Sequence, residues 1–318
     1  MSNSPSVCRL FLPFLACTGL YFAVADGASA QTQNVDRAQM TQSQNDSLSS
    51  FGTGFEGDHA VSSPNDSDLG EQEILKREDR YQPFTVTAGV PGFFTSNAAL
   101  SRTDEKSDFL VAPSVGIFYE PRITNTLYGL IDVREQLFYY DRFDELNFGA
   151  FDVDVGLNYV LPQMENLTLR AAYNYNRLTE RDSFDDFFSN HAFIFSAEVP
   201  VRFGRAQQLS FGTGGNISIA AAQENPRRND YEAYVAYSLG LTRAFYINAV
   251  GRLVLRDYYH QDSRVDVSEI LGVTASYRVT KYFTASAISS LAANQSNHDF
   301  FDYKVGNVGG ALSLSVKF

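Results

Sequence analysis

The stretch Val308-Gly309-Gly310-Ala311-Leu312-Ser313-Leu314-Ser315-Val316-Lys317-Phe318 decides the fold. Its even positions read Val, Gly, Leu, Leu, Val and Phe, and its odd positions read Gly, Ala, Ser, Ser and Lys. Successive side chains of a β-strand point to opposite faces, so this alternation predicts a strand with one apolar and one polar face. Strands of soluble β-sandwiches show the same pattern, so the segments that precede this one have to decide between a sandwich and a barrel.

Alternating segments of this kind follow one another from about residue 82. We place them at residues 82–94, 109–119, 126–140, 147–161, 167–178, 191–203, 208–222, 231–241, 245–257, 265–279, 282–292 and 304–318. Each is near or above the roughly nine to eleven residues that a tilted transmembrane strand requires. Short turns alternate with loops that are mostly longer and more polar, which is typical of membrane barrels with an even number of strands.

The polar faces of these segments favour a barrel over a sandwich. In the fourth segment Val153 and Val155 share one face, whereas Asp152 and Asp154 share the other. Carboxylates are costly in the core of a sandwich unless they are paired, but the lumen of a barrel can hold them either wet or paired. We therefore expect the apolar faces to point outward.

Aromatic residues support this assignment, because the chain contains 26 Phe and 18 Tyr but no Trp. On the apolar face they gather at both ends of the segments, as expected at the two interfaces of a bilayer. The inner set is Tyr119, Tyr159, Phe203, Phe245, Tyr277, Phe283 and Phe318, and the outer set is Phe109, Tyr139, Tyr175, Phe193 and Tyr231. Glu135 and Glu269 break the apolar face near its outer end, where a charge costs at most about 1 kcal/mol.

The last segment resembles the terminal strand of bacterial outer-membrane β-barrel proteins, a broad porin-like class. In that class the final residue is typically Phe and forms part of the signal read by the barrel assembly machinery. The resemblance implies that Phe318 is an assembly signal, and that this machinery and outer-membrane lipid are partners. The expected fold is all-β: a closed antiparallel up-and-down transmembrane β-barrel of about 12 strands (10–14 possible), with both termini periplasmic.

The amino-terminal residues read as an export signal. Arg9, an apolar core and a small-residue site at residues 28–30 predict a secretory signal peptide over residues 1–30. Cleavage there removes Cys8 and Cys17, the chain's two cysteines, and leaves a mature chain without thiol chemistry. The competing interpretation, a lipoprotein acylated at Cys17, is less favoured because the preceding apolar core is very short.

Residues 31–80 differ in composition from the segments that follow. They hold ten acidic and four basic residues and few apolar ones. Such a stretch buries too little apolar surface to offset the entropy of ordering it. We predict an acidic, mostly disordered periplasmic arm, with residues 69–80 as its one helical candidate, followed by the barrel over residues 81–318. The formal charge of −12 gives no reason to expect nucleic acid as a partner.

Polar residues on the inward faces are the candidate functional residues. They are Asp132, Arg134, Asp152, Asp154, Arg170, Asn174, Glu198, Arg202, Glu232, Arg252 and Arg256. They predict either an open mixed-charge channel or a network of ion pairs that fills the lumen, and the sequence does not decide between the two. The leading function is porin-like passive diffusion of small polar solutes. The alternative is a non-conducting structural or adhesive barrel that presents its loops, including Phe184, Phe187 and Phe188, to a partner.

Catalysis is not expected, although one outer-membrane phospholipase family also uses a twelve-stranded barrel. Its chemistry requires a histidine base beside a serine nucleophile, oriented by a third polar group. The chain's histidines are His59 in the arm and His191, His260 and His298 at the outer rim. None adjoins an outward-facing serine in a recognisable motif, and no metal or cofactor site is apparent in the sequence.

Overall fold

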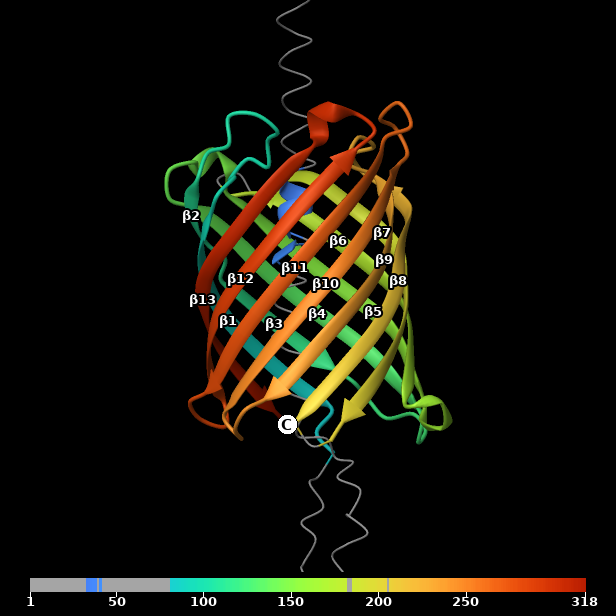
Figure 1. The fold of residues 1–318 in the computed structure, drawn as a ribbon. Helices are drawn as coiled ribbons and strands as arrows, with labels where there is room; N and C mark the ends of the chain where they lie inside the picture. The colour runs from blue at the N-terminus through green and yellow to red at the C-terminus, as the bar shows by residue number, and fades with distance from the viewer. Residues whose placement is uncertain (1–32, 39, 42–80, 182–184, 205) are drawn as a thin grey trace, which may run out of the picture.

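The structure is a computed structural model that describes residues 33–38, 40, 41, 81–181, 185–204 and 206–318. The strands form one closed antiparallel β-barrel with twelve strand positions, and we call this sheet the wall (Figure 1). Its strands are β1 (Phe84–Thr95), β2 (Asp108–Val111), β3 (Ser114–Tyr119), β4 (Leu127–Tyr140), β5 (Phe148–Leu161), β6 (Leu167–Glu180), β7 (Asp186–Phe203), β8 (Gln207–Ala221), β9 (Arg228–Gly240), β10 (Phe245–Tyr258), β11 (Val265–Arg278), β12 (Phe283–Ser296) and β13 (Tyr303–Lys317). Short 3₁₀ turns lie at η2 (Asp144–Leu146), η3 (Pro162–Met164) and η4 (Asp299–Phe301).

Two short strands, β2 and β3, share one strand position, because both pair with β1 and with β4. The interruption falls at Ala112 and Pro113, and proline has no N–H to give to a ladder. The remaining groups are satisfied locally. The backbone N–H of Ala112 donates to the Pro91 carbonyl at 2.9 Å, and that of Leu137 donates to the Pro113 carbonyl at 2.9 Å. The predicted segment 109–119 thus fills one strand position of the barrel, interrupted at Ala112 and Pro113 without a change of register.

The first and last strands close the barrel, as the sequence predicts. β1 pairs with β13 in one continuous register from Thr85 opposite Lys317 to Thr95 opposite Asn307. Beyond the ladder, the N–H of Phe318 donates to the carbonyl of Phe84 at 2.8 Å. Closure leaves no strand with an unpaired edge. This matters because a bilayer offers no water to unpaired backbone N–H and C=O groups.

The two faces of the wall separate as the alternation predicts. Large apolar side chains of the expected outward parity are exposed on the barrel surface, among them Val155, Leu157 and Leu253. Both predicted aromatic sets include strongly exposed members, such as Phe203 and Phe318 in one and Phe109 and Tyr231 in the other. Glu269 also lies on the exposed face, at its expected parity.

The strands differ from the predicted segments mainly at one end of the barrel. Residues 179–190, expected as a loop, are mostly strand, because β6 continues to Glu180 and β7 begins at Asp186. The added residues are mostly polar, apart from Phe187 and Phe188, and register shifts lie at Leu178/Thr179 and His191/Ala192, so strict alternation does not reveal them. Phe188, expected on a loop surface, is consequently only 3% exposed and packs inside the barrel, which contradicts its predicted display to a partner.

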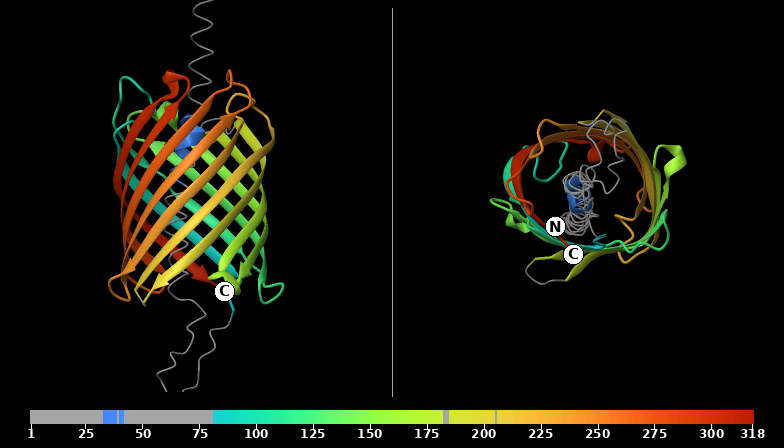
Figure 2. Two further views of the ribbon diagram at one scale, coloured as in Figure 1. Left: turned by 45° about the vertical axis from the view of Figure 1, so that its right-hand side comes forward. Right: turned by 90° about the horizontal axis from the view of Figure 1, so that it is seen from below.

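A helical segment lies inside the barrel, and we call residues 33–38, 40 and 41 the luminal helix (Figures 1 and 2). Seen along the barrel axis, it sits within the ring of strands, and from the side it lies towards the end opposite the carboxy-terminus (Figure 2). The predicted periplasmic arm of residues 31–80 did not include a buried helix at these positions. The predicted signal peptide and the helical candidate at residues 69–80 lie outside the described residues.

Closure should be sensitive to side-chain volume at Gly309 of β13. A Cβ atom there would lie 2.1 Å from the Gly92 carbonyl oxygen and 2.5 Å from the Phe93 Cα, so the β1–β13 backbone would have to shift. We predict that Gly309→Ala destabilises the barrel by about 1–3 kcal/mol, on the scale of other overpacking substitutions. The measurement is the temperature at which the folded band disappears from an unboiled gel. Gly251→Ala is the matched control, because a Cβ at Gly251 meets nothing within 4 Å; equal temperatures for the two variants would contradict the prediction.

Candidate functional site

The sequence-predicted polar residues of β4, β5 and β6 form one paired group on the lumen wall. Arg170 lies 2.6 Å from the Asp154 carboxylate, which also accepts a hydrogen bond from Asn174 at 2.6 Å. Arg134 pairs with Asp132 at 3.0 Å. Asp152 completes the group by accepting a hydrogen bond from the Asn176 amide at 2.7 Å. Because Asp132 and Asp154 are each paired with an arginine and Asp152 accepts from an amide, most of the charge on this wall is compensated locally.

A second paired group lies on β7, β9 and β10. Arg252 pairs with Glu232 at 3.0 Å, and its guanidinium group also lies over the Tyr234 ring, 5.4 Å from the centroid. The Tyr234 hydroxyl donates to the Glu198 carboxylate. Arg202 of β7 is exposed near the β7–β8 turn. The sequence predicts an inward parity for these residues, and the structure adds the contacts that join Glu198, Glu232 and Arg252 through Tyr234.

Arg256, the remaining predicted lumen residue, belongs to a separate buried cluster, which we call the arginine cradle. The cradle consists of Arg228, Arg256, Arg264, Tyr258 and Tyr303. The three guanidinium groups are each no more than 5% exposed. Arg264 pairs with Asp266 and lies over the Tyr258 ring at 4.1 Å, while Arg228 donates to the Tyr258 hydroxyl at 2.7 Å. These contacts pack three positive groups against the wall of β9, β10 and β11.

Asp36 of the luminal helix occupies this cradle. Its carboxylate lies 2.6 Å from Arg228 and 3.8 Å from Arg256, and it accepts a hydrogen bond from the Tyr303 hydroxyl at 3.4 Å. Burial alone would raise the pKa of the Asp36 carboxyl, but Arg256, Arg228 and Arg264 together hold that pKa below its ordinary value. The carboxylate is therefore charged while only 2% exposed.

Arg37 anchors the luminal helix to a different part of the wall. Its guanidinium group donates to the backbone carbonyls of Asn97 at 2.7 Å and Ala98 at 3.1 Å. It also donates to the side-chain oxygens of Thr95 and Asn307, both at 3.4 Å. Thr95 and Asn307 face each other across the β1–β13 closure. Adjacent residues of opposite charge thus fix the helix to two sides of the lumen.

Apolar contacts complete the docking of the luminal helix. Val35 and Ala38 belong to a buried cluster with Phe93, Phe138 and Phe148. Met40 belongs to another, which we call the apolar patch: Leu100, Ala292, Tyr303 and Val305, with Ile270 packed against them. Tyr303 belongs to both the arginine cradle and the apolar patch, so these two surfaces are contiguous.

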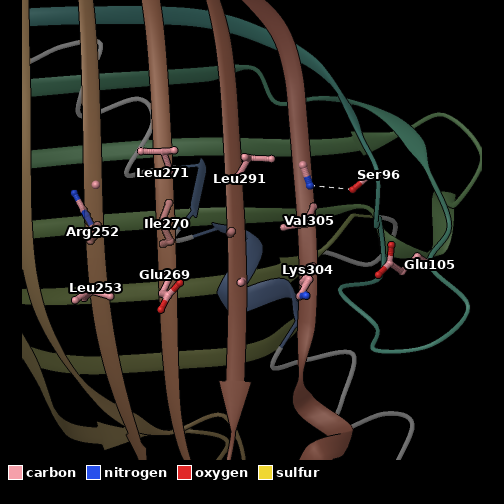
Figure 3. Close-up of a pocket in the computed structure, with 14 residues that line it drawn as sticks. Ser96, Glu105, Arg252, Leu253, Glu269, Ile270, Leu271, Leu291, Lys304 and Val305 are labelled. Atoms are coloured by element: carbon pink, nitrogen blue, oxygen red, sulfur yellow. Dashed lines mark hydrogen bonds between the residues drawn. The ribbon is translucent and has the colours of Figure 1, made fainter.

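Figure 3 shows the part of the wall that carries the apolar patch, with the luminal helix behind strands β10 to β13. An open depression of about 670 Å³ in this wall is lined by residues of these strands and by Ser96 and Glu105. Its lining includes Ile270 and Val305 of the inward parity and Glu269 and Lys304 of the outward parity.

Sequence reasoning missed the residues that make this site different from a simple pore. Arg228 and Arg264 stand in stretches that read as loops, and Asp36 stands in the arm, where no periodicity marks it. Asp36 and Arg37 form an adjacent pair of opposite charges near apolar Val35, Ala38 and Met40. That short amphipathic pattern was the available signal, and it is too brief to distinguish a docked helix from a linker.

The described histidines make contacts typical of a solvated rim. His191 contacts the Tyr173 hydroxyl, His260 pairs with Glu224 at 3.1 Å, and His298 contacts the Asp262 carbonyl at 3.1 Å. In the described part of the chain, none of these imidazole contacts involves a serine hydroxyl. Within those same residues, no group of three or more His, Cys, Asp or Glu side chains is placed to hold a metal ion. No helix among them is both long and apolar enough to cross a membrane.

Solved structures share this architecture at low sequence identity. An outer-membrane channel of Pseudomonas putida F1, described as a COG4313 channel, matches with a TM-score of 0.55 and 9% identity over 74% of this chain and 96% of that one. The outer-membrane phospholipase A of Escherichia coli matches with a TM-score of 0.44 and 12% identity over 72% of this chain and 89% of that one. The NanC porin matches with a TM-score of 0.43 and 8% identity over 72% and 98%.

These findings define the class of protein: the chain has the fold of the integral outer-membrane β-barrels. More particularly, it shares the fold of the Pseudomonas putida channel over nearly that channel's whole length. No family model and no curated protein matches the sequence. A likeness at 9% identity shows the fold alone, so function has to be argued from this chain's own lumen.

The lowered pKa of Asp36 predicts how docking of the luminal helix responds to pH. The charged carboxylate favours docking fully above its ordinary value of 3.8, and this contribution is lost as pH falls through the lower pKa of the docked state. We predict that hydrogen exchange protection of residues 33–38, corrected for intrinsic rates, is unchanged from pH 7 to pH 5 and falls only below about pH 4. Amides of β12 serve as the internal control. Loss of protection between pH 7 and pH 5 would show that another group governs docking.

Proposed function

We propose that this protein is an outer-membrane channel for passive diffusion of small polar solutes, and that the luminal helix closes it in the state described. The observation that carries the proposal is that the lumen is occupied by a separate segment of the chain rather than by side chains of the wall alone. The wall beneath is lined by paired polar groups, including Asp154 with Arg170 and Glu232 with Arg252. A polar lining of this kind suits hydrated solutes.

The proposal includes an orientation with both termini in the periplasm. The connections at the end that carries Phe318 are short, as between β9 and β10 or between β11 and β12, whereas the other end carries longer ones, as between β1 and β2. Short turns on the periplasmic side and longer loops outside are usual for this class. In this orientation the luminal helix lies towards the external end, and Phe318, 62% exposed, is available to the barrel assembly machinery.

The alternative is a non-conducting barrel with a structural or adhesive role. The paired charges and the luminal helix favour it to the extent that they fill the lumen permanently. We propose no catalytic role, because the described histidines lack the serine contact that acyl transfer requires. Conductance separates the channel from the alternative.

The first test compares the full chain with its Asp36→Arg variant in planar bilayers. A third positive group facing Arg228 and Arg256 should expel the luminal helix, because the cradle then holds only like charges at that point. We expect rare, small current steps from the wild type, and steps that are several-fold larger or more frequent from Asp36→Arg. Asp186→Arg on the exposed face of β7 is the control and should behave as the wild type. No steps from either folded protein, with folding checked by heat modifiability, would overturn the channel.

The second test concerns selectivity in the conducting Asp36→Arg background. Replacing Arg134, Arg170 and Arg252 together by Gln leaves their partner carboxylates without a cation, so the pore should shift towards cations. The measurement is the reversal potential in a salt gradient. Arg177→Gln is the matched control, because Arg177 pairs with Asp186 and has the parity of the exposed Tyr173. An unchanged reversal potential in the triple variant would mean that these arginines do not line the path.

A further inference from the structure

The arginine cradle holds one more positive group than the wall itself neutralises. Arg264 is paired with Asp266, and Arg228 lies 2.9 Å from Asp230. Among the ion pairs described, the carboxylate nearest Arg256 is Asp36 of the luminal helix, at 3.8 Å. Three guanidinium groups therefore face two carboxylates of the wall and one that belongs to the helix.

Such an arrangement requires an anion. Taking a guanidinium group out of water is costly unless an opposite charge replaces the lost hydration, and removing one partner of a buried pair is strongly destabilising. Arg256 is 1% exposed and Arg228 is 5% exposed. Whenever Asp36 is absent from the cradle, another anion or bulk water must take its place.

The chemistry around Asp36 specifies a carboxylate. Arg228 approaches one carboxylate oxygen at 2.6 Å, and the Tyr303 hydroxyl donates to the other at 3.4 Å. Two guanidinium groups on one oxygen and a phenol donor on the other match the two oxygens of one carboxylate. The same donors would hold the carboxylate of a ligand in the way that they hold Asp36.

The apolar patch specifies the rest of the ligand. Met40 follows Asp36 by one helical turn, so the two side chains leave the same face of the helix. Met40 belongs to one buried cluster with Leu100, Ala292, Val305 and Tyr303, and the Tyr303 hydroxyl also donates to Asp36. The lumen thus presents an anion site contiguous with an apolar patch, and Asp36 and Met40 of the luminal helix cover the two.

We propose that the arginine cradle and the apolar patch form a binding site for small monocarboxylates with an apolar tail, and that Asp36 and Met40 occupy it as an internal competitor. The carboxylate of the ligand takes the place of the Asp36 carboxylate between Arg228, Arg256 and Tyr303. Its tail takes the place of the Met40 side chain. This inference names the solute class of the channel proposed above, but binding itself does not depend on conduction.

The test is binding of hexanoate to the detergent-purified full chain, measured by isothermal titration. The variant Asp36→Ala/Met40→Ala vacates both positions even where the helix stays docked. We expect it to bind hexanoate at least tenfold more tightly than the wild type, in which the internal competitor lowers the apparent affinity. Acetate lacks the tail and should bind more weakly, and hexanamide lacks the charge and should not bind.

Charge variants on this double-variant background separate the cradle from a general effect of lost positive charge. Adding Arg228→Gln should abolish hexanoate binding, whereas adding Arg177→Gln, which removes an outward-facing arginine paired with Asp186, should leave it unchanged. Heat modifiability confirms that each protein is folded. Equal binding with and without Arg228→Gln, equal binding of hexanoate and hexanamide, or no binding to the double variant would each overturn the site. Binding without bilayer current in the Asp36→Arg variant would sink the channel and keep the site, and current without binding would do the reverse.

Discussion

Satisfaction of every backbone hydrogen bond within the wall is the constraint on which this structure depends. A bilayer offers no water to an unpaired N–H or C=O, so strands can cross it only when the first pairs with the last. The β1–β13 register meets that demand from Thr85 to Thr95. Pro113 has no N–H to donate, but its carbonyl accepts from the N–H of Leu137, and the N–H of Ala112 beside it donates to the carbonyl of Pro91. Closure also turns the alternating pattern into two environments, one for lipid and one for the lumen.

The size of the closed barrel then creates the problem that the luminal helix solves. The lumen of an eight-stranded barrel is narrow enough for side chains to fill, and a barrel with twelve strand positions has a wider one. On β4, β5 and β6 the wall carries pairs such as Asp154 with Arg170, which compensate charge locally. Towards the end opposite the carboxy-terminus the wall carries an arginine excess, and a segment from outside the wall supplies the missing carboxylate. Charge complementarity therefore explains why this segment, and not merely any apolar filler, lies there.

The sequence predicts the wall well and the occupant of the lumen poorly, for one physical reason. Side chains of a strand alternate with a period of two, and the face toward lipid has to be apolar. Segments such as 265–279 can therefore be recognised from the sequence over their whole length. The luminal helix spans too few residues for its period to emerge, and its stability comes from contacts with residues distant in the chain. Arg228 and Arg264 are similarly hard to recognise, because they lie where alternation gives way to turns, and the partner of Arg228, Asp36, is far away in sequence. The same limit explains Phe188, whose burial follows from a bulged extension of β7 that alternation does not record.

The two anchors of the luminal helix differ in what their release requires. Arg37 binds mostly neutral oxygens of β1, β13 and the loop that follows β1, and water can replace such contacts one by one. Asp36 cannot leave so simply, because its departure removes a carboxylate that faces both Arg228 and Arg256 in a buried site. An incoming carboxylate removes that cost at the moment it arises, so entry of the ligand and exit of the helix favour each other. By linkage the coupling is reciprocal: docking of the helix weakens ligand binding by the same free energy by which ligand binding weakens docking of the helix. An ion pair within the chain thereby makes opening of the lumen conditional on the chemistry of the solute.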